Sequence, residues 1–425
     1  MRSIYWFRND LRLKDNPSLN LALEKSDEIL FVYIHDIANE RECSWGFKKM
    51  GNHRKLFLSQ GLDELNQHLG EYNHSVNIYI DNSVVVLEKL VKQYKIDTIF
   101  CESIKTFNEN NQEELIRRMK INIVPYFHSA LFFENQLPFG INELPDIYTD
   151  FRKAIEFNGT KPDKPSSLPK KIFNIESIKD NELIKLDVQL NNYDKSSFPI
   201  TDKNFMGGEK TGLCHLQKYF QSNNPATYKK TRNELIGQNF STKFSPWLAM
   251  GFISARQIFS CLDKYETNVL KNESTYWIFF ELLWRDYFRF IMIKYGKNLF
   301  CRNEPNIPKK NIKHNNDNFK LWTAGKTDNK FINAGMKELK QTGFISNRMR
   351  QIVASYLINE LSCDWRAGAA WFESKLIDYD VYSNQGNWAY ISGCGTDPRG
   401  GRFFNIEKQQ KTYDENSIYQ MLWNS

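Results

Sequence analysis

Asn347-Arg-Met-Arg-Gln351, Asp364-Trp-Arg366, Asp378-Tyr-Asp380, Asn384 and Gly386-Asn-Trp-Ala-Tyr390 follow one another in the C-terminal half of the chain. Apolar residues recur at helical spacing through 347–361 and 367–376, so most of these polar groups are expected on helices. Asp378 and Asp380 follow the end of a helix and need cations or hydrogen-bond donors nearby, for which Arg348 and Arg350 are the candidates. Helices that carry many polar side chains among apolar neighbours usually surround a ligand. The stretch therefore predicts a flat, polar ligand inside a helical domain.

The rest of the C-terminal half has the same helical character. Period-3.6 spacing covers 213–220, 255–265, 276–295 and 331–342, and strand-like alternation is absent after Gly207. We expect an all-α domain over residues 201–425. Before it, residues 133–200 are polar and rich in Pro, which predicts a long connection between domains.

The N-terminal part alternates short apolar runs with helical patterns. Strand-like runs occur at 3–7, 29–34, 76–80, 98–100 and 121–124, separated by stretches of helical spacing. This alternation predicts an open parallel sheet with crossover helices, a Rossmann-like α/β domain over residues 1–132. A G-x-G-x-x-G motif does not follow the first run, which argues against a dinucleotide fingerprint there.

Composition restricts the class of protein. The 425 residues contain 14% aromatic side chains, and the net charge is +7, a mild excess that is compatible with a polyanionic partner. The seven Cys are scattered without a C-x-x-C pair, so we expect neither disulfides nor a metal site. The most apolar run, 276–295, carries five charged residues and is no membrane span. The N-terminus enters a strand-like run directly, and we expect a cytoplasmic protein.

Two further segments carry candidate chemistry. Hydroxyl groups in Ser241-Thr-Lys-Phe-Ser245, together with Lys243, precede Pro246 in a pattern typical of a helix N-terminus with Ser245 as its N-cap. Such a segment either caps the helix or holds a phosphate, and the residues alone leave both open. Glu281, Trp284, Arg285 and Phe288 share one side of a helix, where a carboxylate beside a Trp is costly to bury without a role.

At these residues the chain resembles the photolyase/cryptochrome family, and within it the DASH-type cryptochromes. The resemblance extends over nearly the whole chain, from Tyr5-Trp-Phe-Arg-Asn-Asp-Leu-Arg12 to Gly395-Thr-Asp-Pro-Arg399 and Phe404-Asn405. It implies a helical domain that holds FAD and an enzyme that repairs pyrimidine dimers with blue light, a deoxyribodipyrimidine photo-lyase. It also implies a folate antenna, 5,10-methenyltetrahydrofolate, in the N-terminal domain.

The resemblance assigns roles to individual residues. The residues implied to bind FAD are Tyr228, Ser241, Thr242, Lys243, Phe244, Ser245, Arg285, Arg350, Asp378, Asp380 and Asn384. Within this set, Arg350 and Asp378 would form an ion pair against the isoalloxazine and Asn384 would face flavin N5. The residues implied to contact a flipped dimer are Glu281, Trp284, Asn347, Arg348, Gln351 and Tyr390. The implied catalytic residues are Glu281, which would hydrogen-bond the dimer, Asn384, and Trp365 and Trp388, which would relay electrons.

The chain departs from the family pattern in two places. The outer Trp of the relay should fall near Ile312, and no Trp is there, although Trp322 is nearby. Thr327-Asp-Asn-Lys330 stands where the family has Thr-Gly-x-Pro. For the antenna, Asn108 and Glu109 match a folate-contacting pair in their distance from the strand at 98–100, but two ordinary polar loop residues would look the same.

Several alternatives remain open. One is a blue-light photoreceptor that binds FAD and nucleic acid with little repair activity; the end of the chain soon after the last motif favours the enzyme. A six-four photolyase would need a His pair near 347–351, and no His follows His314. A non-catalytic folate- or nucleotide-binding module would not need Glu281, Trp284, Arg350 and Asp378 together. For the enzyme we expect a monomer that acts on dimers in DNA, with single-stranded or looped DNA preferred and with salt-sensitive binding.

Overall fold

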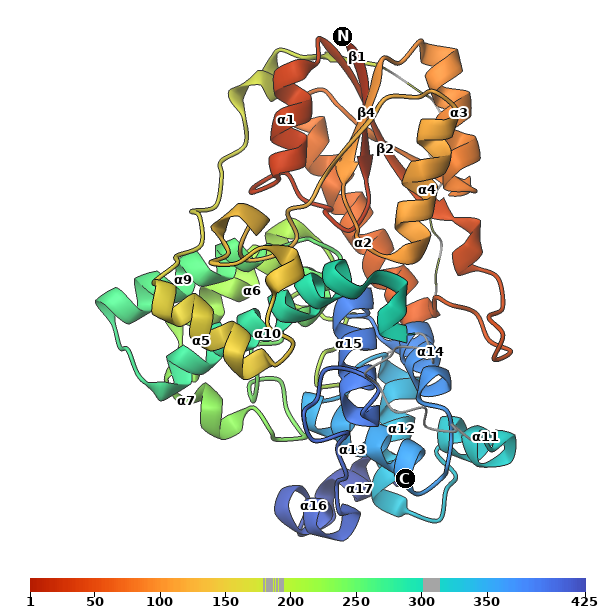
Figure 1. Cartoon of the computed structure of the whole chain (residues 1–425), viewed down its shortest axis with the longest axis vertical. Helices are drawn as coiled ribbons and strands as arrows, with labels where there is room; N and C mark the ends of the chain where they lie inside the picture. The colour runs from red at the N-terminus through yellow and green to blue at the C-terminus, as the bar shows by residue number, and fades with distance from the viewer. Residues whose placement is uncertain (179, 181–185, 187, 189, 191–194, 301–313) are drawn as a thin grey trace.

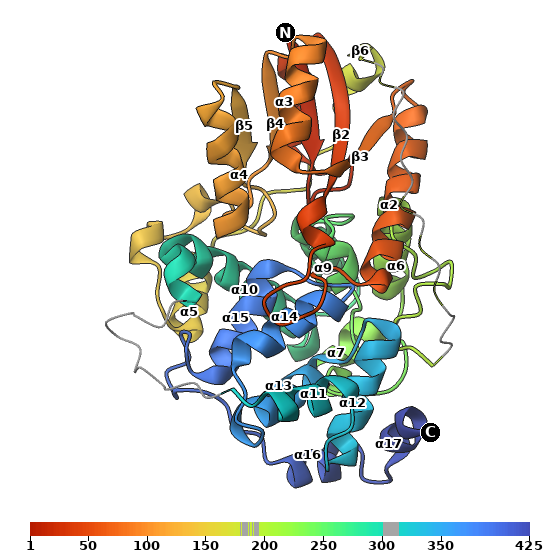
Figure 2. The same ribbon diagram turned by 90° about the vertical axis from the view of Figure 1, so that its right-hand side faces the viewer.

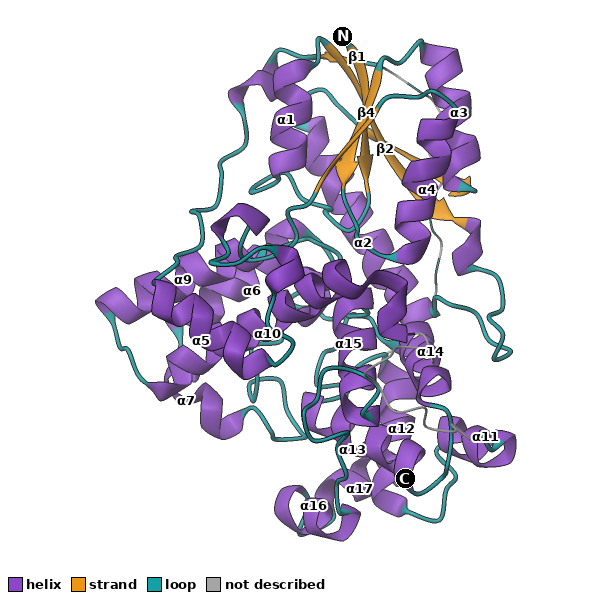
Figure 3. Ribbon diagram, in the orientation of Figure 1, coloured by secondary structure: helices purple, strands orange, loops and turns teal. Residues whose placement is uncertain are grey.

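The computed structural model of the chain describes residues 1–178, 180, 186, 188, 190, 195–300 and 314–425. Strands gather at one end of the molecule and helices make up the rest (Figures 1 and 3). The sheet is parallel and has the order β3-β2-β1-β4-β5, so the expected α/β domain is confirmed. The strands are β1 (Arg2–Phe7), β2 (Glu28–Asp36), β3 (Val76–Asp81), β4 (Thr98–Glu102) and β5 (Ile123–Tyr126).

Helices cover both faces of the sheet because the side chains of each strand alternate between two apolar layers. Tyr5 and Phe7 point into one buried cluster, which continues into the helical domain, whereas Ile4 and Trp6 point into another. The first layer is covered by α1 (Pro17–Lys25) and α2 (Asn52–Gly70), and the second by α3 (Ser83–Tyr94) and α4 (Phe107–Arg118).

The segment expected as a connection, 133–200, contributes more than a linker. It contains helix α5 (Tyr148–Asn158), and its short strand β6 (Glu176–Ser177) pairs with the start of β2. The Tyr148 hydroxyl donates a hydrogen bond of 2.8 Å to the carbonyl oxygen of Phe280 in the helical domain. The connection is therefore attached to both domains.

The C-terminal part is helical, as expected (Figure 2). Its long helix α10 (Glu273–Tyr295) is the one on which Glu281 and Arg285 were predicted. The other helices are α6 (Glu209–Gln221), α7 (Asn224–Thr231), α8 (Ser245–Ala249), α9 (Ala255–Asn268), α11 (Asn316–Ala324), α12 (Lys330–Thr342), α13 (Asn347–Asn359), α14 (Trp365–Lys375), α15 (Val381–Ser392), α16 (Ile406–Tyr413) and α17 (Ile418–Asn424). Across the described residues, every helix is too short or too polar to cross a lipid bilayer.

A buried polar junction joins the two domains. Asp15 accepts hydrogen bonds from Arg256 at 3.1 Å and from the Ser254 hydroxyl at 2.5 Å, and Arg256 is 1% exposed. Gly251 has φ +71°, and a Cβ there would lie 1.9 Å from the carbonyl oxygen of Asn9. Only glycine allows the two chain segments to approach this closely.

Residues 327–330, which depart from the family pattern, form a turn held by several hydrogen bonds. Thr327 donates through its amide and its hydroxyl to the Asn333 side chain, at 2.8 Å each. Asn329 caps α12 by accepting from the amides of Phe331 and Ile332 at 3.0 and 3.1 Å. Lys330, which stands where the family pattern has Pro, is the first residue of α12, and Asn329 caps the helix just before it.

Candidate functional site

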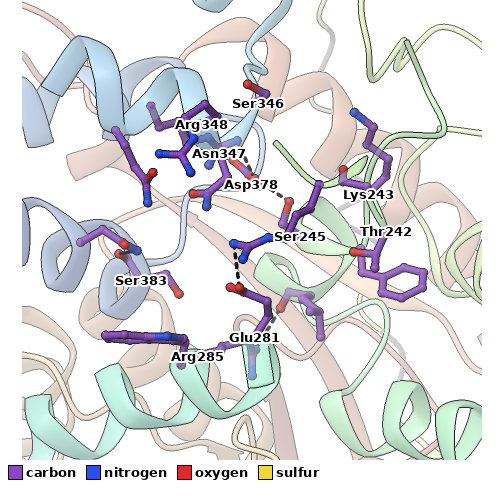
Figure 4. Close-up of a pocket in the computed structure, with 18 of the residues that line it drawn as sticks. Thr242, Lys243, Ser245, Glu281, Arg285, Ser346, Asn347, Arg348, Asp378 and Ser383 are labelled. Carbon is purple, nitrogen blue, oxygen red and sulfur yellow. Dashed lines mark hydrogen bonds and ion pairs between the residues drawn. The ribbon is translucent and has the colours of Figure 1, made fainter. Parts of the chain in front are cut away.

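A cavity of about 720 Å³ opens in the helical domain, and it brings together residues that are far apart in sequence (Figure 4). Its walls come from α7, α8, α10, α13, α15 and the loop 240–244. Predicted site residues that line it are Tyr228, Ser241, Thr242, Lys243, Phe244, Ser245, Glu281, Trp284, Arg285, Asn347, Arg348, Arg350, Gln351, Asp378, Asp380 and Tyr390. The expectation that Glu281, Trp284, Arg285 and Phe288 share one side of their helix is confirmed, because all four line the cavity.

One end of the cavity is formed by the segment 241–245. Lys243 is 2% exposed, and its Nζ lies 3.3 Å from the centre of the Phe240 ring. Among the described residues this Nζ has no hydrogen-bond partner. Burial lowers the pKa of Lys243 well below its usual range. A buried amine without a partner, beside several hydroxyl groups, is suited to an anionic group such as a diphosphate.

Ser245 does not cap α8, contrary to our expectation. The helix begins at Ser245 itself, with Phe244 in the N-cap position and no side-chain capping bond. The Ser245 hydroxyl instead donates to Asp378 Oδ2 at 2.7 Å, because that carboxylate is the stronger acceptor within reach. The serine therefore joins the 241–245 segment to the start of the Asp378–Asp380 turn.

Asp378 has the cationic neighbour that its position requires. Arg350 Nη2 lies 2.9 Å from Asp378 Oδ2, and Arg350 Nε donates to the Ile345 carbonyl oxygen at 3.0 Å. Of the two arginines considered from the sequence, Arg350 makes this pair, whereas Arg348 donates to Asn233 Oδ1 at 3.1 Å. The ion pair lies in the cavity wall, where a ring system would pack against it.

Asp380 is held by a residue that the sequence reasoning did not single out. Arg289 donates to both of its carboxylate oxygens at 3.1 Å, and Asp380 also caps α15. Burial alone would raise the pKa of Asp380, but Arg289 and Arg285 outweigh it and lower the pKa. Arg289 lies four residues after Arg285 on α10, so helical spacing could have identified it.

Arg285 itself binds the chain of the N-terminal domain. Its Nη1 donates to the Ser129 carbonyl oxygen at 2.6 Å. Burial and the nearby Arg289 together lower its pKa to about 9. Arg285 therefore links the cavity to the strand-rich domain.

The other side of the cavity contains Glu281 and aromatic rings. Arg232, which the sequence reasoning did not single out, pairs with Glu281 at 2.7 Å. Trp284 is stacked on Tyr148 of α5, with ring centres 3.6 Å apart, and meets Tyr390 edge-on at 5.4 Å. The connecting segment thus supports a wall of the cavity through Tyr148. Neither Arg232 nor Tyr148 has a spacing relation to α10 that sequence alone would show.

Three residues predicted to act at the flavin, and the two antenna candidates, lie outside the lining. Asn384 is 8% exposed, and its Nδ2 donates to the Ala369 carbonyl oxygen at 3.1 Å. Trp365 and Trp388 are 3% and 2% exposed in the adjoining apolar core. The antenna candidates Asn108 and Glu109 are on the first turn of α4, where Glu109 accepts from the Thr106 hydroxyl. The position near Ile312 lies outside the described residues.

FAD fits this cavity in charge and in unsatisfied groups. Six basic and three acidic side chains line it, which favours a ligand with two negative charges. Lys243 Nζ and Asp378 Oδ1 are buried without hydrogen-bond partners in the described part of the chain. A diphosphate would satisfy the first, and a ribityl hydroxyl or ring N–H would satisfy the second.

Comparisons with known proteins agree with this fit. Residues 3–170 match the family described as DNA photolyase, and residues 277–424 match the FAD binding domain of DNA photolyase. Cryptochrome DASH of Idiomarina loihiensis is 38% identical, over 99% of this chain and 92% of that protein. Cryptochrome DASH of Xenopus laevis is 40% identical, over 98% and 81%. The crystal structure of a Synechocystis cryptochrome, at 38% identity, superposes with a TM-score of 0.91 over 100% of this chain and 88% of that one. The chain therefore belongs to the photolyase/cryptochrome family, and within it to the DASH cryptochromes.

Proposed function

We propose that the chain repairs cyclobutane pyrimidine dimers with blue light, by electron transfer from reduced FAD to a dimer flipped out of DNA. The observation that carries the proposal is that Glu281 and Trp284 open into the same cavity as Lys243 and Asp378. One side of the cavity can thus bind an anionic cofactor, and the side next to it has a carboxyl group and aromatic rings. A bound base needs this second combination, since its ring stacks and its polar edge forms hydrogen bonds.

Different residues of the cavity would bind the diphosphate and the ring system of FAD. Ser241, Thr242 and Lys243 would hold the FAD diphosphate, and the Arg350–Asp378 pair would support the isoalloxazine. The bound flavin supplies the chemistry, an electron given under blue light that opens the cyclobutane ring and then returns. A fixed arginine near the negatively charged reduced ring stabilises that charge without reorganisation.

The dimer side would use Glu281 as its polar anchor. Burial raises the pKa of Glu281, and Arg232 opposes this effect. A protonated carboxyl group can donate a hydrogen bond to a base carbonyl on which negative charge develops. Trp284, stacked firmly on Tyr148, would provide a rigid face for the dimer rings. Asn347, Arg348 and Gln351 would contact the remaining edges from α13.

The proposal extends to the substrate and to the surroundings of the protein. We propose single-stranded or looped DNA as the preferred substrate, because a lesion there is already unpaired and costs less to flip. The lining residues Arg348 and Arg402 would contact phosphates, so binding should weaken with salt. A folate would serve as antenna, with Asn108 and Glu109 as contacts, and the protein would act as a cytoplasmic monomer.

The test is repair of one dimer-containing oligonucleotide offered as single strand, as a loop and as duplex, in blue light and in darkness. The flavin spectrum is recorded alongside. We expect light-dependent repair that is fastest on the single strand. Normal flavin photochemistry and DNA binding without repair in any of the three forms would contradict the proposal and support the photoreceptor alternative.

A further inference from the structure

We propose that Trp45, in a loop of the N-terminal domain, is the residue through which electrons enter the protein from solution to reduce the flavin. Trp322 would connect Trp45 with Trp388, next to the cavity. The inference rests on the flavin cavity of the proposed function and does not depend on DNA repair. A path through Trp45 would take the place of the outer Trp of the family relay, since residues 301–313 contain neither Trp nor Tyr in their sequence.

The inner end of the path is Trp388 on α15. The same helix contributes Ser383, Asn387 and Tyr390 to the cavity wall, while Trp388 is buried in the core behind it. The Trp388 ring centre lies 6.3 Å from that of Trp322 and 5.0 Å from that of Phe372, edge-on in both cases. The Trp388 indole is therefore edge-on to a second indole, that of Trp322, which does not line the cavity.

Trp322 continues the path through the core. It is fully buried at 0% exposure, and its Nε1–H donates to the Val353 carbonyl oxygen at 3.1 Å. This bond holds the ring in one orientation. Its ring is also stacked on Phe372 at 6.3 Å and on Phe319 at 6.0 Å, the latter with an angle of 23° between the planes. Because a carbonyl oxygen is a poor base, an oxidised Trp322 would keep its proton and pass the positive charge on.

The outer end of the path is Trp45, which belongs to the loop between β2 and α2 (Figure 2). The loop runs down beside α14 (Figure 2), and the Trp45 side chain is partly exposed. Its ring centre lies 6.3 Å from Phe319 and 4.8 Å from His314. Phe47 anchors the same loop edge-on against Trp371 of α14, at 5.2 Å. The loop thus brings an oxidisable ring from one domain to the core of the other.

Indole is much easier to oxidise than a benzene ring, so Phe319 would act as a bridge between Trp322 and Trp45, not as a stopping point. The sequence of steps conserves electrons. Trp388 gives one electron to the light-excited oxidised flavin and is restored by Trp322, which is restored in turn by Trp45. The Trp45 indole then loses its N–H proton to water. A thiol in solution returns a hydrogen atom to Trp45, and two thiyl radicals combine to a disulfide.

The experiment follows flavin photoreduction in the purified, FAD-containing full chain, under blue light and without oxygen, with dithiothreitol as the thiol. We expect Trp45→Phe and Trp322→Phe each to slow photoreduction at least about tenfold. Trp45→Tyr should restore much of the rate and replace the transient Trp-radical spectrum with that of a tyrosyl radical. A purely structural role of Trp45 would not produce this spectral change.

Trp423→Phe is the matched control, because it removes a buried indole of the same domain that lies outside the path. It should photoreduce at the wild-type rate. FAD content and melting temperature are measured for every variant; if Trp322→Phe loses FAD, the exposed-end variants Trp45→Phe and Trp45→Tyr still decide. The proposal would be overturned by a wild-type rate of photoreduction in Trp45→Phe, or by slow photoreduction in Trp371→Phe instead. It would also be overturned if the flavin of the unmodified chain were not photoreduced at all.

The same variants separate this inference from the proposed function. When the flavin is reduced with dithionite instead of light, Trp45→Phe should repair dimers as the unmodified chain does. If neither protein repairs while photoreduction still depends on Trp45, the repair proposal fails and the entry path stands.

Discussion

Arg232, at the end of α7, and Glu281, on α10, form an ion pair of 2.7 Å inside the cavity. Arg232 therefore neutralises Glu281 while no substrate is bound. A DNA phosphate that attracts Arg232 would remove this stabilisation, and the burial of Glu281 would then raise its pKa further. Substrate binding would in this way favour the protonated carboxyl group that the dimer needs.

Glu281→Gln should lower the quantum yield of repair without loss of FAD. Glutamine keeps the shape of the side chain and still donates a hydrogen bond, but its amide is a weaker donor than a protonated carboxyl group, and it leaves Arg232 without its anionic partner. We expect a fall of about fivefold, equivalent to a weakening of this hydrogen bond by about 1 kcal/mol. The yield per absorbed photon on a dimer-containing single strand measures this effect.

The pH profile provides the control for that variant. In the unmodified chain the yield should fall as pH rises through the raised pKa of Glu281, since the protonated form is the donor. Glu281→Gln should show no such fall. An unchanged yield and an unchanged profile in the variant would exclude Glu281 as the donor.

Lys243→Met should stabilise the ligand-free protein and weaken FAD binding. The amine is buried without a hydrogen-bond partner among the described residues. Replacing it by an apolar side chain of similar length should therefore raise the free energy of unfolding of the FAD-free protein. With FAD bound, the loss of one charge-assisted contact of about 1.5–3 kcal/mol lowers affinity about tenfold to a hundredfold. Thermal unfolding of the apoprotein and FAD titration measure the two effects. Lys218→Met, at an exposed position of α6, should change neither; loss of stability in Lys243→Met would contradict the assignment.

Asp378→Asn should lose FAD during purification. The Asp378 carboxylate accepts from both Ser245 and Arg350, and an amide would leave the arginine without its counter-charge. Removing one partner of this partly buried pair should also cost about 1–3 kcal/mol of unfolding free energy. The flavin-to-protein absorbance ratio is the measurement. Asp317→Asn, in the exposed pair with Lys320, is the control that should retain FAD.

The helices and strands, and the pairs of site residues that are close in sequence, could be predicted, because they depend on local periodicity. The strands at 3–7 and 76–80 and the helix at 331–342 were predicted within a few residues of the observed β1, β3 and α12. The position of Arg350 and Asp378 near one another was also anticipated, since helix α13 and the 378–380 turn carry complementary charges.

Contacts between distant elements were not predictable in this way. Arg232 meets Glu281 only because α7 packs against α10, and Tyr148 meets Trp284 only because the Pro-rich connection folds back as α5. Ser245 was expected as a helix cap, and its hydroxyl is instead bound to Asp378, 133 residues further along the chain. In each case, tertiary packing selected one partner among several that local rules allow.

Glu338→Gln should make the stability of the protein less sensitive to pH. Glu338 is 1% exposed on α12, accepts a hydrogen bond from Tyr419 of α17, and has its pKa raised by burial from 4.5 to about 8. Between these two values the folded protein holds a proton that the unfolded chain has released, so unfolding becomes easier as pH rises from about 5 to about 8. Each pH unit in that window should cost the unmodified chain up to about 1.4 kcal/mol that Glu338→Gln does not lose. Urea unfolding at several pH values measures the difference, and equal pH slopes for the two proteins would show that Glu338 is already ionised in the folded state.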